Sequence, residues 1–121
     1  MAEHNDFGKA GEHAAVVYLE DHGYIIRDRN WRQGHLELDI VAMLNGTLVI
    51  VEVKTRKDRL FARPEDAVTV AKIKRTVKAA NAYINQHEID APVRFDIVTV
   101  VGNPDCFEIE HIEEAFYPPL C

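Results

Sequence analysis

An unbroken apolar run, Leu48 to Val51, is the feature that most constrains how this chain folds. A short apolar run bounded by turn signals is typical of a strand that is covered on both faces of a sheet. It follows Asn45-Gly46, which is a strong signal for a tight hairpin turn. A second apolar stretch, Leu36 to Met43, precedes that turn. The pattern therefore predicts a hairpin whose second strand, Thr47 to Thr55, is central in a sheet.

The remaining apolar periodicity predicts two helices and three more strands. Helical spacing covers Phe7 to about His22 and Glu65 to about Gln86. Strand-like stretches cover Tyr24 to Trp31, Arg94 to Val101 and Cys106 to Glu110. The order α-β-β-β-α-β-β predicts an α/β fold with one mixed central sheet flanked by helices. Because the chain has 121 residues, we expect a single domain, residues 1–121, with its core at about 7–116.

Composition is typical of a reduced globular protein. Hydrophobic residues make up 47% of the chain, which is ordinary for a globular protein and argues against disorder. No stretch approaches the roughly 18 apolar residues that a membrane span requires, and the polar N-terminus lacks the apolar segment of a secretory signal. The two cysteines, Cys106 and Cys121, give no disulfide framework. These features predict a cytoplasmic protein with no membrane partner.

Charged residues interrupt both strands of the predicted hairpin. Alternation places Glu52 and Lys54 on one face of the second strand and Asp39 on one face of the first, while the even-numbered residues 36–42 line its other face. Pairing of the strands would bring Asp39 and Glu52 within a few ångströms. One of these carboxyls must then take up a proton unless a cation lies between them. Mg²⁺, or Mn²⁺ in its place, is the natural cation, because it binds carboxylates together with water and phosphate oxygens.

Glu12 and Lys54 extend this candidate site. Glu12 lies on the apolar stripe of the first helix, where its carboxylate either faces a cation or simply responds to the helix dipole. Lys54 is suited to orient a metal-bound water and to stabilise charge on phosphorus. The alternative for Glu52 and Lys54 is an exposed strand end with a weak ion pair, worth about 0–1 kcal/mol.

Basic residues are concentrated after this motif, although the whole chain carries a net charge of −6. Residues 54–78 hold nine of the fourteen Lys and Arg residues against three acids, a local charge of +6. Such a zone is typical of a surface for a phosphate backbone, and a solvated loop and helix face is the alternative. The residues expected to contact nucleic acid are Arg56, Lys57, Arg59, Arg63 and Lys72.

Other common chemistries have no support in the sequence. The six histidines lack the close spacing of zinc ligands, and there is no C-x-x-C pair. Neither of the usual glycine-rich nucleotide-binding loops is present. The acids and Lys54 are therefore the main candidates for function.

Motifs along nearly the whole chain resemble those of the YraN family of small bacterial proteins. They are Phe7-Gly8-(x)2-Gly11-Glu12, Arg29-Asn30-Trp31-Arg32, Glu37-Leu38-Asp39-Ile40-Val41-Ala42, Val51-Glu52-Val53-Lys54-Thr55-Arg56, Pro64-Glu65-x-Ala67-Val68, Arg94-Phe95-Asp96 and Ile112-(x)2-Ala115-Phe116. The resemblance implies the restriction-endonuclease-like (PD-(D/E)XK) fold and similarity to archaeal Holliday junction resolvases.

The same resemblance implies roles for individual residues. Glu12, Asp39 and Glu52 would be metal-site acids, Lys54 the catalytic lysine, and Lys72 a basic position facing the site or the substrate. One residue departs from the family pattern, because Leu36 stands where the family usually has a glycine. A glycine there would permit a bulge or a close backbone approach, so this chain is expected to differ in local strand geometry.

Together, these features predict a Mg²⁺- or Mn²⁺-dependent endonuclease that hydrolyses phosphodiester bonds in DNA, with branched or single-stranded structures as expected substrates. Two alternatives stay open. One is a non-catalytic nucleic-acid-binding protein that retains the fold, and the other is a protein-interaction scaffold that uses the acidic C-terminal region. A small nuclease that cuts two strands needs two active sites, which would imply a homodimer.

Overall fold

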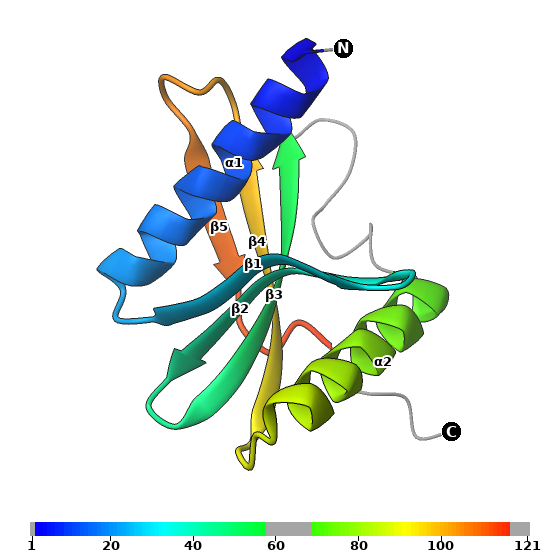
Figure 1. The fold of residues 1–121 in the computed structure, drawn as a ribbon. Coiled ribbons are helices and arrows are strands. Elements are labelled where there is room, and N and C mark those ends of the chain that lie inside the picture. Colours follow the sequence, from blue (N-terminus) through cyan, green and yellow to red (C-terminus); the bar gives the residue numbers. More distant parts are fainter. Residues whose placement is uncertain (1, 58–68, 117–121) are drawn as a thin grey trace.

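The computed structural model describes residues 2–57 and 69–116 and shows a sheet with one helix against each face (Figure 1). Its elements follow the predicted order and confirm the α/β class. They are α1 (Ala2–Asp21), β1 (Ile25–Gln33), β2 (Leu36–Leu44), β3 (Thr47–Arg56), α2 (Val70–His87), β4 (Val93–Val101) and β5 (Glu108–Ile112). Neither described helix is long and apolar enough to cross a membrane.

The strands form one mixed sheet in the order β1-β2-β3-β4-β5. Antiparallel pairs join β1 to β2, β2 to β3 and β4 to β5, whereas β3 and β4 run parallel. A parallel pair requires a long connection, and α2 lies within it. The prediction that β3 is central is therefore confirmed.

The β2–β3 turn has the backbone that the sequence predicts. Asn45 and Gly46 have φ values of 50° and 82°, and Leu44 pairs with Thr47 across them. Positive φ at both central residues is the requirement of a type I′ hairpin turn, which asparagine followed by glycine meets at low steric cost. This turn sets the register in which β2 and β3 pair.

Two apolar clusters hold the helices against the sheet. The α1-side cluster contains Ala15, Val16, Leu19, Tyr24, Ile40, Ala42, Val49, Val51, Val98 and Val100. The α2-side cluster contains Leu38, Val41, Leu48, Ile50, Ala79, Ala80, Tyr83 and Phe95. Their separation shows that the apolar run of β3 is covered on both faces, as predicted.

The predicted alternation along β2 is wrong at its start. Leu36 and Leu38 pack in or against the α2-side cluster, whereas Ile40 belongs to the α1-side cluster. The paired stretch of β2 with β3 ends at Ile40 and Val51. Beyond that point, the β1–β2 hairpin turns away from β3 toward α2 (Figure 1), so its side chains no longer follow a flat-strand alternation.

Helix α2 begins later than predicted. Thr69 is extended, with φ −94° and ψ 164°, and its side-chain oxygen accepts a hydrogen bond from the backbone N–H of Lys72 at 3.1 Å. This is an N-cap, so the helix begins at Val70 instead of at Glu65. Residues 65–68 lie outside the described residues. The last strand also begins later, at Glu108 instead of Cys106.

Helix α1 approaches β3 closely at Gly11. A Cβ added there would overlap the Oγ1 and Cγ2 atoms of Thr55. We therefore expect Gly11→Ala to lower the free energy of unfolding by about 1–3 kcal/mol, measured by urea denaturation. Gly8→Ala is the matched control, because a Cβ there meets no described atom within 4 Å. Gly8→Ala should instead raise the free energy of unfolding by about 0.5–1 kcal/mol, because alanine has the higher helix propensity. An equal increase in Gly11→Ala would contradict the close packing of Gly11 against Thr55.

Candidate functional site

Asp39 and Glu52 lie where β2 and β3 separate. Ile40 pairs with Val51, and continuing this register by one position places Asp39 opposite Glu52. The backbone N–H of Val53 donates a hydrogen bond to Oδ2 of Asp39 at 2.9 Å. The carboxylate thus takes the place of a strand partner, which fixes it beside β3. The structure brings together the two acids that the hairpin register predicts to be neighbours.

The surroundings of Asp39 disfavour its charged form. Burial, and then the neighbouring Glu52 carboxylate, raise the pKa of Asp39 from 3.8 to about 6. The hydrogen bond from Val53 acts in the opposite direction, as does Lys72, while Glu12 adds to the increase. Burial and the neighbouring carboxylates therefore outweigh the groups that favour the charged form of Asp39.

Two lysines share one oxygen of Glu52. Lys72 Nζ lies 2.6 Å and Lys54 Nζ 3.2 Å from Glu52 Oε2. Burial, and the adjacent Lys72, lower the pKa of Lys54. Burial acts in the same direction on Lys72, but its contacts with Glu52 and Lys54 outweigh it and raise its pKa. Lys72 thus keeps its charge more firmly, and Lys54 gives up a proton more readily.

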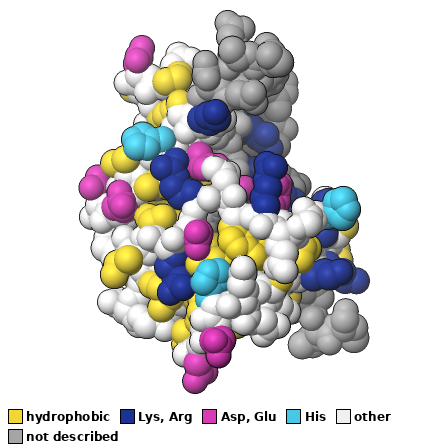
Figure 2. Space-filling view, in the orientation of Figure 1, with side chains coloured by type: hydrophobic (Ala, Val, Ile, Leu, Met, Phe, Trp, Pro, Cys, Tyr) yellow, Lys and Arg dark blue, Asp and Glu magenta, His cyan; other side chains and the backbone are white. Residues whose placement is uncertain are grey.

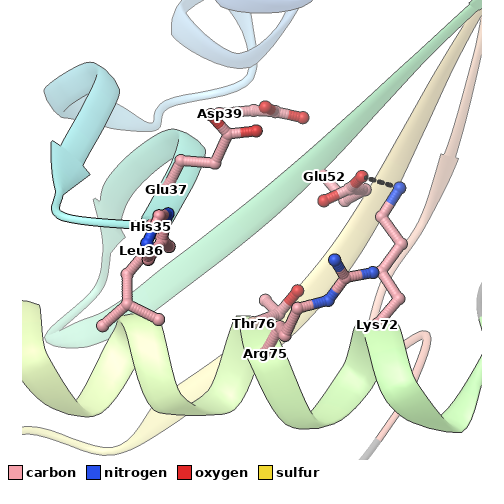
Figure 3. Close-up of a pocket in the computed structure, with 8 residues that line it drawn as sticks. All are labelled: His35, Leu36, Glu37, Asp39, Glu52, Lys72, Arg75 and Thr76. Atoms are coloured by element: carbon pink, nitrogen blue, oxygen red, sulfur yellow. Dashed lines mark ion pairs between the residues drawn. The ribbon is translucent and has the colours of Figure 1, made fainter.

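A pocket of about 280 Å³ lies beside these carboxylates, between the β1–β2 hairpin and α2 (Figure 3). Leu36, which stands where the resemblance led us to expect a glycine, projects toward α2 and forms one wall, while β1–β2 pairing is maintained at Gln33 and Leu36. Several lining residues have no signal in the sequence patterns, because α2 meets the hairpin only in the folded chain. The pocket is lined by His35, Leu36, Glu37, Asp39, Glu52, Lys72, Arg75 and Thr76.

Glu12 projects from α1 but is held by other partners. Its Oε1 accepts a hydrogen bond from Asn30 Nδ2 at 2.6 Å and lies 4.0 Å from an Arg29 Nη atom. Asn30 has φ 52°, a left-handed conformation that asparagine tolerates within a strand. Within residues 2–57 and 69–116, no three acidic, His or Cys side chains are arranged to hold a metal ion. Glu12 is near enough to Asp39 to raise its pKa, but within the described residues it forms no three-ligand cluster with Asp39 and Glu52.

The predicted phosphate-contacting residues have different positions. Arg56 and Lys57 are exposed at the end of β3, where Lys57 Nζ lies 5.9 Å from the centroid of the Phe7 ring. Arg59 and Arg63 lie outside the described residues. Other Lys and Arg side chains lie over β1 and α2 (Figure 2), and the exposed ones are Arg27, Arg29, Arg32, Lys74, Arg75 and Lys78. The basic surface therefore includes β1, which the count over residues 54–78 missed.

A second charged cluster is buried away from the pocket. Asp96 is fully buried and accepts hydrogen bonds from Arg94 Nε and Nη2 at 2.9 and 2.8 Å and from the Glu114 N–H at 3.1 Å. His111 Nε2 lies 2.7 Å from the same carboxylate, and Arg94 also donates to the Tyr24 hydroxyl at 2.6 Å. These groups satisfy one another, so the cluster joins β4 to β5 and to the start of β1.

The fold and site define a class of small α/β protein, with a mixed five-stranded sheet and with two carboxylates and two lysines gathered where strands separate. This chain belongs to the family described as "Uncharacterised protein family UPF0102", whose model matches residues 11–100.

Similar proteins come from several bacteria. A UPF0102 protein of Bacteroides thetaiotaomicron is 68% identical over 120 residues, with 99% of each chain covered. One of Phocaeicola vulgatus is 58% identical over 120 residues, again with 99% of each chain covered. One of Flavobacterium psychrophilum is 48% identical over 117 residues, which covers 97% of this chain and 98% of the relative. Membership of a family of small bacterial proteins is thereby confirmed, while the relationship to restriction endonucleases and Holliday junction resolvases stays a prediction.

Proposed function

We propose that this protein is a Mg²⁺- or Mn²⁺-dependent nuclease that hydrolyses phosphodiester bonds of DNA in the pocket between the β1–β2 hairpin and α2. The observation that supports it most is that Asp39 and Glu52 line the same pocket, with Lys54 Nζ 3.2 Å from Glu52 Oε2. Carboxylate oxygens are the ligands that Mg²⁺ and Mn²⁺ favour in proteins. The raised pKa of Asp39 is consistent with a cation site, because a nearby divalent cation would offset the burial and the Glu52 charge and favour the charged carboxylate.

Each residue has a role in this proposal. Asp39 and Glu52 hold the cation, and Glu12 supports that site from α1. When bound, the cation lowers the pKa of a coordinated water and polarises the phosphoryl group. Lys54, whose pKa is lowered, accepts a proton from the attacking water or orients it by a hydrogen bond. The DNA backbone is held by the exposed Arg56 and Lys57 and by the exposed arginines of β1. Arg59 and Arg63, which lie outside the described residues, are expected from the sequence to contribute to the same contact.

Cleavage of labelled branched or nicked DNA by the purified protein with Mn²⁺ tests this proposal. Glu52→Gln should reduce cleavage to background, because it removes a charged ligand while it keeps the side-chain shape. Lys54→Met should lower the rate by on the order of 10²–10³-fold. Glu37→Gln is the matched control, since Glu37 lines the same pocket but is 61% exposed and paired with Arg32 at 3.3 Å. Cleavage that persists in Glu52→Gln would point to a contaminant and contradict the proposal.

A non-catalytic nucleic-acid-binding protein is the second candidate. The observation that favours it is that Lys54 and Lys72 already neutralise Glu52 without a metal ion. In that case, DNA binding should weaken as salt increases, and no divalent cation should produce cleavage. Charge reversal at Arg56 and Lys57 should then abolish binding, while Glu52→Gln still binds.

A further inference from the structure

Lys72 contacts the proposed metal ligand from a position that is unfavourable for a positive charge. It lies in the first turn of α2, where its backbone N–H bonds to the Thr69 cap. The positive end of the helix dipole disfavours an ammonium group at this end of a helix. The side chain nevertheless reaches across the pocket to Glu52 at 2.6 Å (Figure 3). The ion pair with Glu52 offsets the unfavourable position.

We propose that Lys72 is a built-in counter-ion that neutralises Glu52 until a divalent cation displaces it. The proposal rests on the proposed function, because it takes Glu52 to be a metal ligand. Mg²⁺ binds oxygen ligands at about 2.0–2.1 Å, so a cation at Glu52 would repel an ammonium group only 2.6 Å from the same carboxylate. Lys72 and the metal ion therefore compete for one carboxylate.

The two lysines on Glu52 differ in how easily they can leave. Lys54 lies two residues from Glu52 on the same strand, and its side chain is only 16% exposed. Lys72 is on a different element, is 29% exposed and lines the open pocket. The Lys72 ammonium can thus move into the pocket while α2 stays in place. Lys54 stays beside Glu52 in both states.

Direct titration with Mn²⁺, followed by electron paramagnetic resonance of the free ion and without nucleic acid, tests this exchange. Lys72→Met should bind Mn²⁺ about fivefold to tenfold more tightly than the wild type, because the competitor is gone. Arg75→Met is the matched control. Arg75 is basic and lines the same pocket from α2, but within the described residues it forms no ion pair with either carboxylate. Arg75→Met should change the Mn²⁺ affinity by less than about twofold, because it removes a positive charge that does not compete with the metal ion for Glu52.

Two further variants make the result specific. Lys72→Arg keeps the positive charge and should show no gain in Mn²⁺ affinity, whereas Glu52→Gln should lose the site. If Lys72→Met binds Mn²⁺ no more tightly than Arg75→Met, the counter-ion role is wrong, and the metal site of the wild type still stands. If neither the wild type nor Lys72→Met binds Mn²⁺, the proposed function and this inference both fail.

Discussion

Asp96→Ala is expected to lower the free energy of unfolding by about 3–5 kcal/mol at neutral pH, measured by chemical denaturation. The substitution leaves the Arg94 guanidinium without its buried carboxylate partner, in a place where the Arg94 side chain is only 17% exposed. It also removes the acceptor for the Glu114 N–H and the partner of His111. Unpaired charges and donors in such surroundings are costly, because water cannot replace the lost partner.

Glu113→Gln is the control for this loss. Glu113 Oε1 also lies near Arg94, at 3.6 Å, but its side chain is 63% exposed. An exposed ion pair is worth about 0–1 kcal/mol, so this variant should remain close to the wild type. A loss below about 1 kcal/mol in Asp96→Ala would show that the buried cluster does not stabilise the fold.

The effect of Asp96 should depend on pH in a defined direction. Burial acts to raise the pKa of Asp96, but His111, Arg94 and the Glu114 N–H outweigh it, so the pKa lies below its ordinary 3.8. The stabilisation is then present above that ordinary pKa, which the unfolded chain has, and is lost as the pH falls through the lower pKa of the folded protein. The stability curves of the wild type and Asp96→Ala should approach each other as the medium is acidified.

Asp39→Asn should have the opposite effect on stability, with a gain of about 1–3 kcal/mol at pH 8. Asparagine keeps an oxygen that can accept the Val53 hydrogen bond, but it carries no charge next to Glu52. The folded pKa of Asp39 is raised to about 6 from 3.8. Wild-type stability is therefore lost as the pH rises between these two values, and the variant escapes that loss. Denaturation of both proteins at pH 4 and at pH 8 measures the difference.

A difference that is absent at pH 4 and present at pH 8 is the expected signature. Glu37→Gln is again a suitable control, because its exposed carboxylate should make little difference at either pH. Mn²⁺ at millimolar concentration should stabilise the wild type and leave Asp39→Asn nearly unchanged, since a ligand stabilises only the state that binds it. A variant that is less stable than the wild type at pH 8 would mean that Asp39 is charged and well compensated.

Local sequence signals are sufficient to predict the order of elements and the proximity of Asp39 and Glu52. The Asn45-Gly46 turn sets the β2–β3 register, and that register then decides which acids face each other. The predicted start of α2 was wrong because two signals compete in this segment. The apolar spacing favours a helix from Glu65, whereas Thr69 is a good N-cap and is the one that the folded chain uses. Such boundaries depend on which capping residue the folded chain uses.

Contacts between distant elements were beyond the sequence patterns. Glu12 meets Asn30, and Lys72 meets Glu52, only because α1 and α2 pack on opposite faces of the sheet. The Asp96 cluster had one local signal, an arginine and an acid two positions apart on the same strand, where their side chains share a face. Its third partner, His111, lies on another strand.

The hydrogen bond from Val53 to Asp39 bears on how members of this family should be compared with one another. Asp39 satisfies a backbone donor where two strands part, so selection for folding alone would retain an acceptor at this position. An acid or amide at the position of Asp39 in a relative is consequently only weak evidence that the relative is a catalyst. Glu52 and Lys54 satisfy no such backbone group among the described contacts, so this pair is the better marker for the proposed nuclease function. If the proposed nuclease function is correct, relatives that keep the first position and lose these two should have the same architecture without the catalytic activity.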